Sequence, residues 1–301
     1  MLLILITVVQ LGTVDYATAL KLQQQLVALR KEEKIGDVLL LLEHRPVITL
    51  GRNAKAANVV ASPELLAQRG VELFQCDRGG DVTFHGPGQI VGYPIFDLRG
   101  FPSLEGQRKT LGVIEFVRRL EDVLIRTCTD FGIPTKRVPG LTGVWTDSSI
   151  TAELCTNDGV RDDREGQDVS PAAKGAQQGA AFAAVGAHAE AKLAAIGVHL
   201  SRFVTSHGFA LNLNTDLSYF NLIIPCGITS KPVSSMKKEL GRELDLNAVA
   251  ESLSRNFGTV FHSQMLWVET LDTLLGRTVG VPMSPPEEMR HLHKDDETNC
   301  A

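Results

Sequence analysis

The chain has 301 residues, of which 44% are hydrophobic and 22% are charged, and its formal net charge is -5. This composition is ordinary for a globular protein and excludes a chain that is disordered throughout. The acidic balance provides no general attraction to nucleic acid or to anionic membranes, so we expect neither as a partner. The five cysteines form no CxxC pair and no zinc-finger spacing, which argues against a disulfide framework and against a metal site.

The apolar start of the chain is too short to span a bilayer. It has no basic lead and no small-residue cleavage site after it, so it does not have the pattern of a signal peptide. We interpret residues 1–10 as a first β-strand. The expected location is cytoplasmic, or the mitochondrial matrix if the organism is eukaryotic.

Predicted helices and strands alternate along the chain. Asp15 is placed to cap a helix whose Leu22, Leu26 and Leu29 fall on one face. Further helices are expected from residue 62 to Gly70 and at 113–131 and 248–257. Strands are expected at residues 37–42, 47–50, 71–75, 89–98, 192–199, 203–205 and 208–213. The alternation predicts an α/β fold, with flanking helices on a mixed sheet.

One segment has a composition unlike the rest. Residues 153–171 are polar and acidic, and residues 172–191 contain thirteen Ala or Gly among twenty. Such a segment buries little surface, so we interpret residues 150–191 as a flexible insertion between two neighbouring strands. The predicted domain organisation is a single catalytic domain over residues 1–265 and a partly disordered C-terminal extension over residues 266–301.

A glycine-rich segment at residues 77–89 is the first candidate for a binding site. Its glycines allow a close approach of the backbone to a ligand, and it also carries Arg78 and His85. A tight turn between two strands is the competing interpretation. The segment has neither the Gly-Lys-Ser/Thr ending of a phosphate loop nor the dinucleotide glycine spacing, which disfavours nucleotide binding.

Two residues further along have side chains suited to acyl chemistry. Lys192 begins an apolar run, where lost hydration would make its amine a usable acid or base, unless it only reaches out to solvent. Cys226 follows the apolar stretch 221–225 at a turn, where a thiol can accept an acyl group as a thioester. The competing interpretation of Cys226 is an inert buried cysteine.

His207 precedes an alternating strand in the sequence Thr-Ser-His-Gly. It could bind substrate, orient another group or be a satisfied polar residue at the start of a strand. The residues alone leave these three roles open.

The order of these segments resembles the lipoyl(octanoyl) transferase family. The matching sequences are RGGDVTFHGPGQ, GVW, KLAAIGVH, TSHGFALN and IIPCG, and they cover the chain up to about Gly241. The resemblance implies the fold of biotin and lipoate protein ligases. The sequence departs from the family pattern at His199, where the family has arginine, and in the segment 231–236. These departures leave fine donor recognition open.

The resemblance also implies a set of site residues. Cys226 and Lys192 would form a catalytic dyad. Residues of the glycine-rich segment would line the acyl and donor pocket: Arg78, Gly79, Gly80, His85, Gly86 and Gln89. The wall near the thioester would come from Gly197, His207, Gly208 and Ala210, with backbone amides near Gly197 or Gly227 stabilising the oxyanion. No metal or other cofactor is expected beyond the phosphopantetheine that the donor carries.

The implied reaction transfers an octanoyl group from acyl carrier protein, through a thioester on Cys226, to a lysine of a lipoyl domain. Such domains occur in the E2 subunits of 2-oxoacid dehydrogenases, and the H protein of glycine cleavage is a further implied acceptor. Because these proteins are acidic, we expect a docking patch, for which a solvated surface is the competing interpretation. The candidate patch residues are Arg118, Arg119, Lys136 and Arg137.

Three other functions compete with this reading. An ATP-dependent lipoate or biotin ligase on the same scaffold would activate a free acid and would need no thiol. A cysteine hydrolase would use Cys226 with His207 and release free acid. A non-enzymatic module would bind carrier proteins without acyl transfer.

Overall fold

The computed structural model describes residues 4–103, 109–147 and 190–271. The strands are β1 (Ile4–Val14), β2 (Asp37–His44), β3 (Val47–Leu50), β4 (Glu72–Gln75), β5 (Val82–His85), β6 (Gln89–Ile95), β7 (Thr135–Val138), β8 (Leu141–Thr146), β9 (Lys192–Ser201), β10 (Val204–Asn212) and β11 (Ser263–Val268). The α-helices are α1 (Tyr16–Lys31), α2 (Pro63–Gln68), α3 (Val113–Asp130), α5 (Met236–Leu240) and α6 (Leu246–Phe261). Short 3₁₀ helices include η2 (Leu98–Gly100), η3 (Leu217–Leu222) and η4 (Pro225–Gly227).

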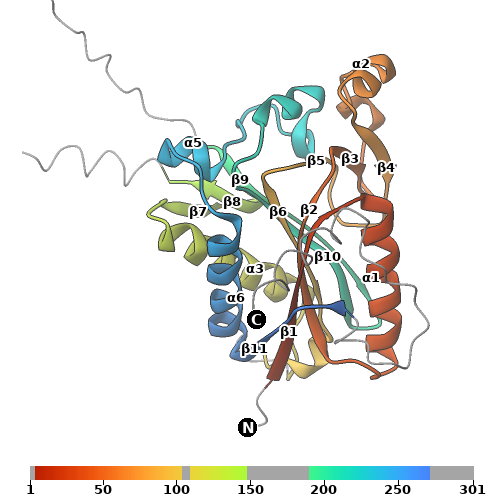
Figure 1. Ribbon diagram of the computed structural model, residues 1–301, viewed down its shortest axis with the longest axis vertical. Helices are drawn as coiled ribbons and strands as arrows, with labels where there is room; N and C mark the ends of the chain where they lie inside the picture. Colours follow the sequence, from red (N-terminus) through yellow and green to blue (C-terminus); the bar gives the residue numbers. More distant parts are fainter. Residues whose placement is uncertain (1–3, 104–108, 148–189, 272–301) are drawn as a thin grey trace, which may run out of the picture.

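Eight strands form one mixed sheet in the order β11-β1-β2-β6-β10-β9-β8-β7, and a small second sheet has the order β4-β3-β5. Strand β1 is parallel to both of its neighbours, whereas β2, β6, β10, β9 and β8 pair in antiparallel fashion. Helix α1 covers one face of the large sheet, and α3 and α6 cover the other (Figure 1). The expected α/β fold with flanking helices is therefore confirmed.

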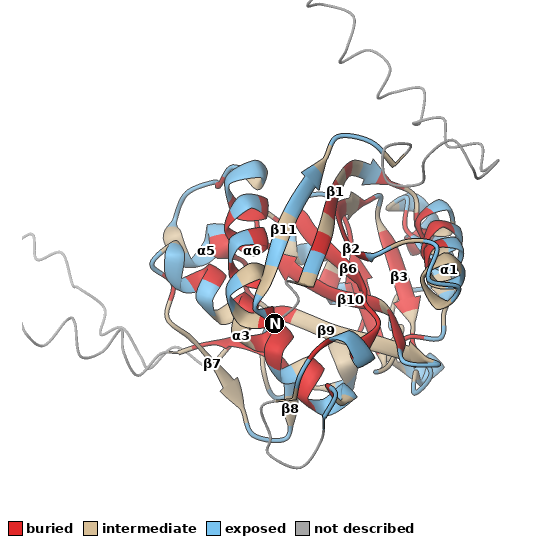
Figure 2. Ribbon diagram, turned by 90° about the horizontal axis from the view of Figure 1, so that it is seen from below, coloured by how far each residue is buried: buried red, intermediate tan, exposed pale blue. Residues whose placement is uncertain are grey.

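Strand β2 shows how the sequence produces a sheet that is buried on both faces. Leu39 and Leu41 pack with α3 and α6, while Val38, Leu40 and Leu42 pack with α1. Successive side chains of a strand point to opposite faces, so burial on both faces requires an unbroken apolar run. Figure 2 shows these buried strands between the two helical layers.

Most of the expected elements are found, with shifts at their ends. Asp15 caps α1, because its side chain accepts a hydrogen bond from the backbone N–H of Thr18. The strand expected at 47–50 is β3. The strands expected at 203–205 and 208–213 are wrong as separate elements, since β10 runs through both. The polar Ser-His-Gly sequence suggested a break there, but the backbone passes it with a left-handed residue, His207, at φ 54°.

The segment 77–89 was expected to be one loop, and this expectation is wrong. Residues 82–85 form β5, which pairs antiparallel with β3. The β-branched Val82 and Thr83 and the aromatic Phe84 favour a strand, and the surrounding glycines concealed the signal. Strands β7 and β11 also lacked a sequence prediction.

The described elements nearest the expected domain boundaries are β8, β9 and β11. Strands β8 and β9 are paired neighbours, so the segment between them does connect adjacent strands. The core of the expected insertion, residues 148–189, lies outside the described residues, but Ala191 belongs to the fold because its carbonyl accepts from Thr146 N–H at 2.9 Å. At the other end, the boundary expected at residue 265 falls inside β11. Residues 272–301 of the expected extension lie outside the described residues.

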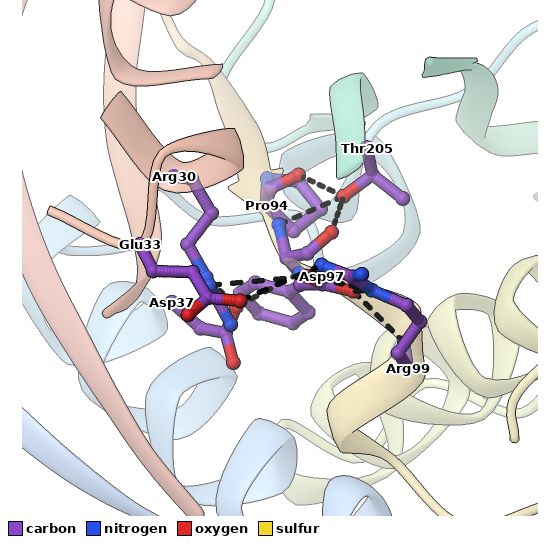
Figure 3. Close-up of polar contacts among 8 residues, drawn as sticks. Arg30, Glu33, Asp37, Pro94, Asp97, Arg99 and Thr205 are labelled. Carbon is purple, nitrogen blue, oxygen red and sulfur yellow. Dashed lines mark hydrogen bonds and ion pairs between the residues drawn. The ribbon is translucent and has the colours of Figure 1, made fainter. Parts of the chain in front are cut away.

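A cluster of charged and polar side chains joins the end of α1 to three strands (Figure 3). Arg30 Nε donates to Asp37 Oδ1 at 2.8 Å, and the same oxygen accepts from the backbone N–H of Asp97 at 2.8 Å. Arg99 forms an ion pair with Asp97, and Thr205 Oγ1 donates to the Pro94 carbonyl at 2.7 Å. These contacts hold together the start of β2, the end of β6 and the start of β10.

None of the helices within the described residues combines the length and the apolarity that crossing a bilayer requires.

Candidate active site

A cavity of about 560 Å³ opens where the small sheet meets β9 and β10 of the large sheet. Ten of the twelve site residues expected from the sequence line it, and these are Arg78, Gly79, Gly80, His85, Lys192, Gly197, His207, Gly208, Ala210 and Cys226. Small-molecule sites typically have volumes of roughly 300–1,000 Å³. The fold therefore brings segments that are more than a hundred residues apart to one ligand-sized pocket.

Lys192 lies at the start of β9, with 8% of its surface exposed. Its Nζ donates to Cys226 Sγ at 3.5 Å and lies 4.8 Å from the centre of the Trp145 ring. The indole face attracts a cation, which offsets part of the hydration that the lysine loses. Backbone bonds hold the residue in place, because Lys192 N–H donates to Pro232 and its carbonyl accepts from Ser234.

Cys226 lies in the middle of η4, the single turn formed by residues 225–227. Its backbone has φ 55° and ψ 18°, which is left-handed and costs a non-glycine residue roughly 1–2 kcal/mol. The following residue, Gly227, is also left-handed at φ 67°. Strain of this kind persists only where the surroundings hold it, and it is concentrated at functional sites. The half-buried thiol is thereby turned towards the pocket and Lys192.

The backbone N–H of Gly227 does not point at the pocket as an oxyanion donor. It donates to the Ile224 carbonyl at 3.1 Å and closes the turn. The expectation that this amide stabilises an oxyanion is therefore wrong. The donor that contacts the Cys226 sulfur is the side-chain amine of Lys192.

Arg78 lines the pocket and also holds the glycine-rich segment in place. Its guanidinium donates to the carbonyls of Thr49 and Asp81, each at 2.6 Å, and to the carbonyl of Gly79 at 3.0 Å. These bonds wrap the glycine-rich segment around the buried cation. Gly79 N–H in turn donates to the Val198 carbonyl at 3.0 Å, which ties this segment to β9.

Gly86 and Gln89 do not line the main cavity, in contrast to the sequence prediction. Gln89 is buried and its Nε2 donates to Asn212 Oδ1 at 2.8 Å, while its Oε1 lies 2.7 Å from His85 Nδ1. A β-carbon on Gly86 would lie 2.5 Å from the Phe84 ring. Gln89 therefore orients His85, and Gly86 allows the Phe84 ring to pack.

Burial lowers the pKa of His85 to about 3, so its imidazole is neutral near pH 7. Because the Gln89 amide nitrogen donates elsewhere, its oxygen accepts, which places the imidazole proton on Nδ1. Burial likewise lowers the pKa of His44 to about 4. His44 Nδ1 donates to the Val14 carbonyl, and its Nε2 accepts from the Tyr93 hydroxyl at 2.6 Å.

His207 is paired with an acid rather than with the thiol. Its Nε2 lies 2.7 Å from Asp77 Oδ1, and its backbone N–H donates to Gln23 Oε1 at 2.7 Å. Burial lowers the pKa of His207, although Asp77 acts in the opposite direction. The contact made by Cys226 is with Lys192, which weighs against the cysteine hydrolase.

The expected basic docking patch is not an unpaired positive surface. Arg119 is buried and bonded to Glu115. The other three side chains are also paired, Arg118 with Glu121, Arg137 with Glu121 and Asp122, and Lys136 with Asp147 and Glu190. Glu115 and Glu121 lie on the same helix as Arg118 and Arg119, whereas Asp147 and Glu190, which pair with Lys136, come from other segments.

Three aromatic residues at the pocket were not predicted to be site residues. Tyr16 and Tyr93 line the cavity, and Trp145 supports Lys192. Each lies in an apolar segment, where an aromatic residue is expected in the core. Among the described residues, no three His, Cys, Asp or Glu side chains converge in a group that could hold a metal ion.

The family model for the lipoyl protein ligase A/B catalytic domain matches residues 15–258. The chain belongs to this family. A protein named octanoyltransferase from Koribacter versatilis is 54% identical over 292 residues, covering 97% of this chain and 98% of the relative. An octanoyltransferase from Acidobacterium capsulatum is 47% identical, covering 90% of this chain and 96% of the relative. The resemblance noted in the sequence is thus confirmed at the level of the family.

Solved structures of lipoate protein ligases share the fold. A lipoate-protein ligase A bound with ATP aligns with a TM-score of 0.55 at 13% identity, covering 87% of each chain. A bipartite lipoate protein ligase from Thermoplasma acidophilum, described with its E2 lipoyl domain as an archaeal lipoylation system, aligns with a TM-score of 0.54 at 13% identity, covering 89% of this chain and 86% of that one. At such low identity the likeness concerns the fold alone.

Proposed function

We propose that this protein is an acyltransferase that moves an octanoyl group from acyl carrier protein to a lysine of a lipoyl domain, through a thioester on Cys226. The observation that carries the proposal is the contact of 3.5 Å between Lys192 Nζ and Cys226 Sγ at the wall of the pocket. The octanoyltransferase names of two relatives, at 54% and 47% identity, support the choice of acyl group.

In the first half-reaction, the Cys226 thiolate attacks the thioester carbonyl of the donor. The bond between the carbonyl carbon and the phosphopantetheine sulfur then breaks, and Lys192 gives its proton to the departing thiolate. The product is an octanoyl-enzyme and a free carrier thiol. Exchange between two thioesters is close to isoenergetic, so this step is reversible.

In the second half-reaction, the ε-amine of an acceptor lysine attacks the acyl carbon on Cys226. Lys192, now neutral, accepts the proton that the attacking amine loses, and the Cys226 thiolate departs. An amide is more stable than a thioester, so this step draws the reaction forward. One lysine thus serves as acid and then as base, and pH–rate data describe the dyad rather than either residue.

The pocket walls suit a medium-length acyl tail. Val91, Ala195 and Ala210 lie side by side on three adjacent strands and line the cavity. Their small apolar side chains leave room for a hydrocarbon chain in the cavity that the dyad also lines. The proposal needs no nucleotide, and the cytoplasmic location stays a prediction.

The decisive experiment records the intact mass of the protein after incubation with octanoyl acyl carrier protein. We expect a hydroxylamine-labile octanoyl adduct on the wild type, no adduct on Cys226→Ala, and transfer of the adduct to an added lipoyl domain. Transfer from free octanoate only when ATP is added would instead identify a ligase. Release of free octanoate without an acceptor would identify a hydrolase.

A further inference from the structure

The strained turn that carries Cys226 is held from one side by the segment 55–61. The backbone N–H of Ile224 donates to the Asn58 carbonyl at 2.7 Å. Val60 and Ala61 N–H both donate to the Leu222 carbonyl, at 3.0 and 3.1 Å. The chain leading into η4 is therefore fastened to a segment that contributes neither member of the dyad.

The side chain of Asn58 extends this fastening to the glycine-rich segment. Its Nδ2 donates to Asp81 Oδ2 at 2.6 Å. The second carboxylate oxygen, Asp81 Oδ1, accepts from the backbone N–H of Val82 at 2.8 Å and of Lys55 at 3.1 Å. One carboxylate thus joins the start of β5 to the segment that holds the cysteine turn.

The turn itself packs directly on this pair. A β-carbon built on Gly227 would lie 3.0 Å from Asp81 Oδ2 and 3.3 Å from Asn58 Nδ2. Only a glycine permits such close approach in a left-handed conformation. Gly227, the residue after Cys226, therefore packs against the Asn58–Asp81 hydrogen bond. Because one peptide unit joins the two residues, a displacement of that bond would also displace Cys226.

We propose that Asn58 and Asp81 are positioning residues, which hold the Cys226 turn in its strained conformation and so keep the sulfur against Lys192. The cost of the left-handed Cys226 has to be offset by the surroundings, and this hydrogen bond packs directly against Gly227 of the turn. The inference rests on the proposed function, because positioning matters for the transfer of an acyl group through Cys226.

The test exchanges the side chains of Asn58 and Asp81 in two steps. Asn58→Asp places two carboxylates at the distance of the present hydrogen bond, so we expect the rate of octanoyl-enzyme formation to fall about tenfold or more. Adding Asp81→Asn to that variant restores an amide facing a carboxylate, and we expect the rate to return to within about threefold of wild type. Asn58 does not line the pocket, so in Asn58→Ala the loss should appear in kcat, with KM for the donor nearly unchanged.

A second measurement separates this inference from the proposed function. The carbamidomethylation of Cys226 by iodoacetamide, followed on the peptide that contains it, needs no acyl donor. The rate of alkylation depends on how the turn holds the sulfur beside Lys192, so the reaction should slow in Asn58→Asp and recover in the double variant. If the wild type forms no octanoyl adduct, the proposed function fails while the alkylation rates still decide the role of the pair.

The matched control is Asn256→Ala. Asn256 Nδ2 donates to Asp130 Oδ2 at 3.0 Å between α6 and α3, and neither residue lines the pocket. We expect this variant to lose stability without changing either rate in the folded protein. The inference would be overturned by wild-type rates in Asn58→Asp, or by a double variant that is no faster than the single one.

Discussion

Lys192 Nζ lies 3.5 Å from Cys226 Sγ, although the two residues come from different strands and turns and are 34 positions apart in the chain. The same ammonium group faces the Trp145 ring, on which Lys231 Nζ also rests at 5.8 Å. Two lysines therefore share one indole, and only Lys192 contacts the thiol. This asymmetry provides a direct test of the dyad.

Replacing Lys192 by methionine should lower the rate of octanoyl-enzyme formation by about 10²–10⁴-fold, the usual contribution of a general acid or base. Lys231→Met is the matched control, because Lys231 touches the same ring but is paired with Glu190 and does not line the main cavity. Its rate should stay within about threefold of wild type. Stopped reactions analysed by intact mass measure both rates. Equal losses in the two variants would contradict the dyad.

Ala210 provides a test of the acyl pocket. It is 4% exposed and lies between Val91 and Ala195 on the cavity floor. Ala210→Leu adds three carbons there, so we expect the octanoyl rate to fall about tenfold or more while a butanoyl donor keeps most of its rate. Ala248→Leu adds the same volume on the exposed face of α6 and should change neither rate. An unchanged ratio of octanoyl to butanoyl rates in Ala210→Leu would show that the tail lies elsewhere.

The buried histidines predict how stability depends on pH. The folded pKa values of His44 and His85 are about 4 and about 3, against an ordinary value of 6.5. Below pH 6.5 the unfolded chain binds protons that the folded protein excludes, so stability is complete above pH 6.5 and is lost as pH falls towards the folded values. At pH 5 each histidine should remove about 2 kcal/mol from the free energy of unfolding.

Urea unfolding at pH 7.5 and pH 5.0 measures this difference. His44→Gln and His85→Gln should each reduce the pH-dependent loss by about 2 kcal/mol. At pH 7.5 both imidazoles are neutral in both states, so the values there give the packing cost of each substitution. A variant that keeps the full wild-type difference between the two pH values would disprove the assignment for that histidine.

Phe96 tests the core on the far side of the sheet. It is fully buried and its ring contacts those of Phe101, Phe116, Phe257 and Phe261. Phe96→Ala should lower the free energy of unfolding by about 3–5 kcal/mol, through lost burial and the cavity that remains.

The control is Phe203→Ala, because Phe203 is 55% exposed and should cost about 1 kcal/mol or less. Thermal unfolding gives both values. In the folded fraction, the rate of octanoyl-enzyme formation should match wild type in each variant. Similar losses of stability for the two residues would show that the phenylalanine cluster is not the centre of the core.

The sequence by itself predicted the family and most of the elements, and it proposed Lys192 and Cys226 as the dyad. Helix caps and turn residues act over three or four positions, so signals such as Asp15 can be read along the chain. Runs such as residues 37–42 also predict a strand buried on both faces without reference to distant residues. The motifs around Lys192 and Cys226 pointed to the proposed chemistry because they resemble motifs of the family.

Only the tertiary structure decided which of these residues meet. The pairing of β9 with β8 brings Lys192 to Trp145, and the left-handed backbone at Cys226 turns the thiol towards it. Conversely, Lys136 looked like a surface cation along the chain but is paired with Asp147 and Glu190. Long-range contacts of this kind depend on strand order and helix packing, which local sequence patterns do not encode. The same reason explains why the Asn58–Asp81 bond is visible only in the folded protein.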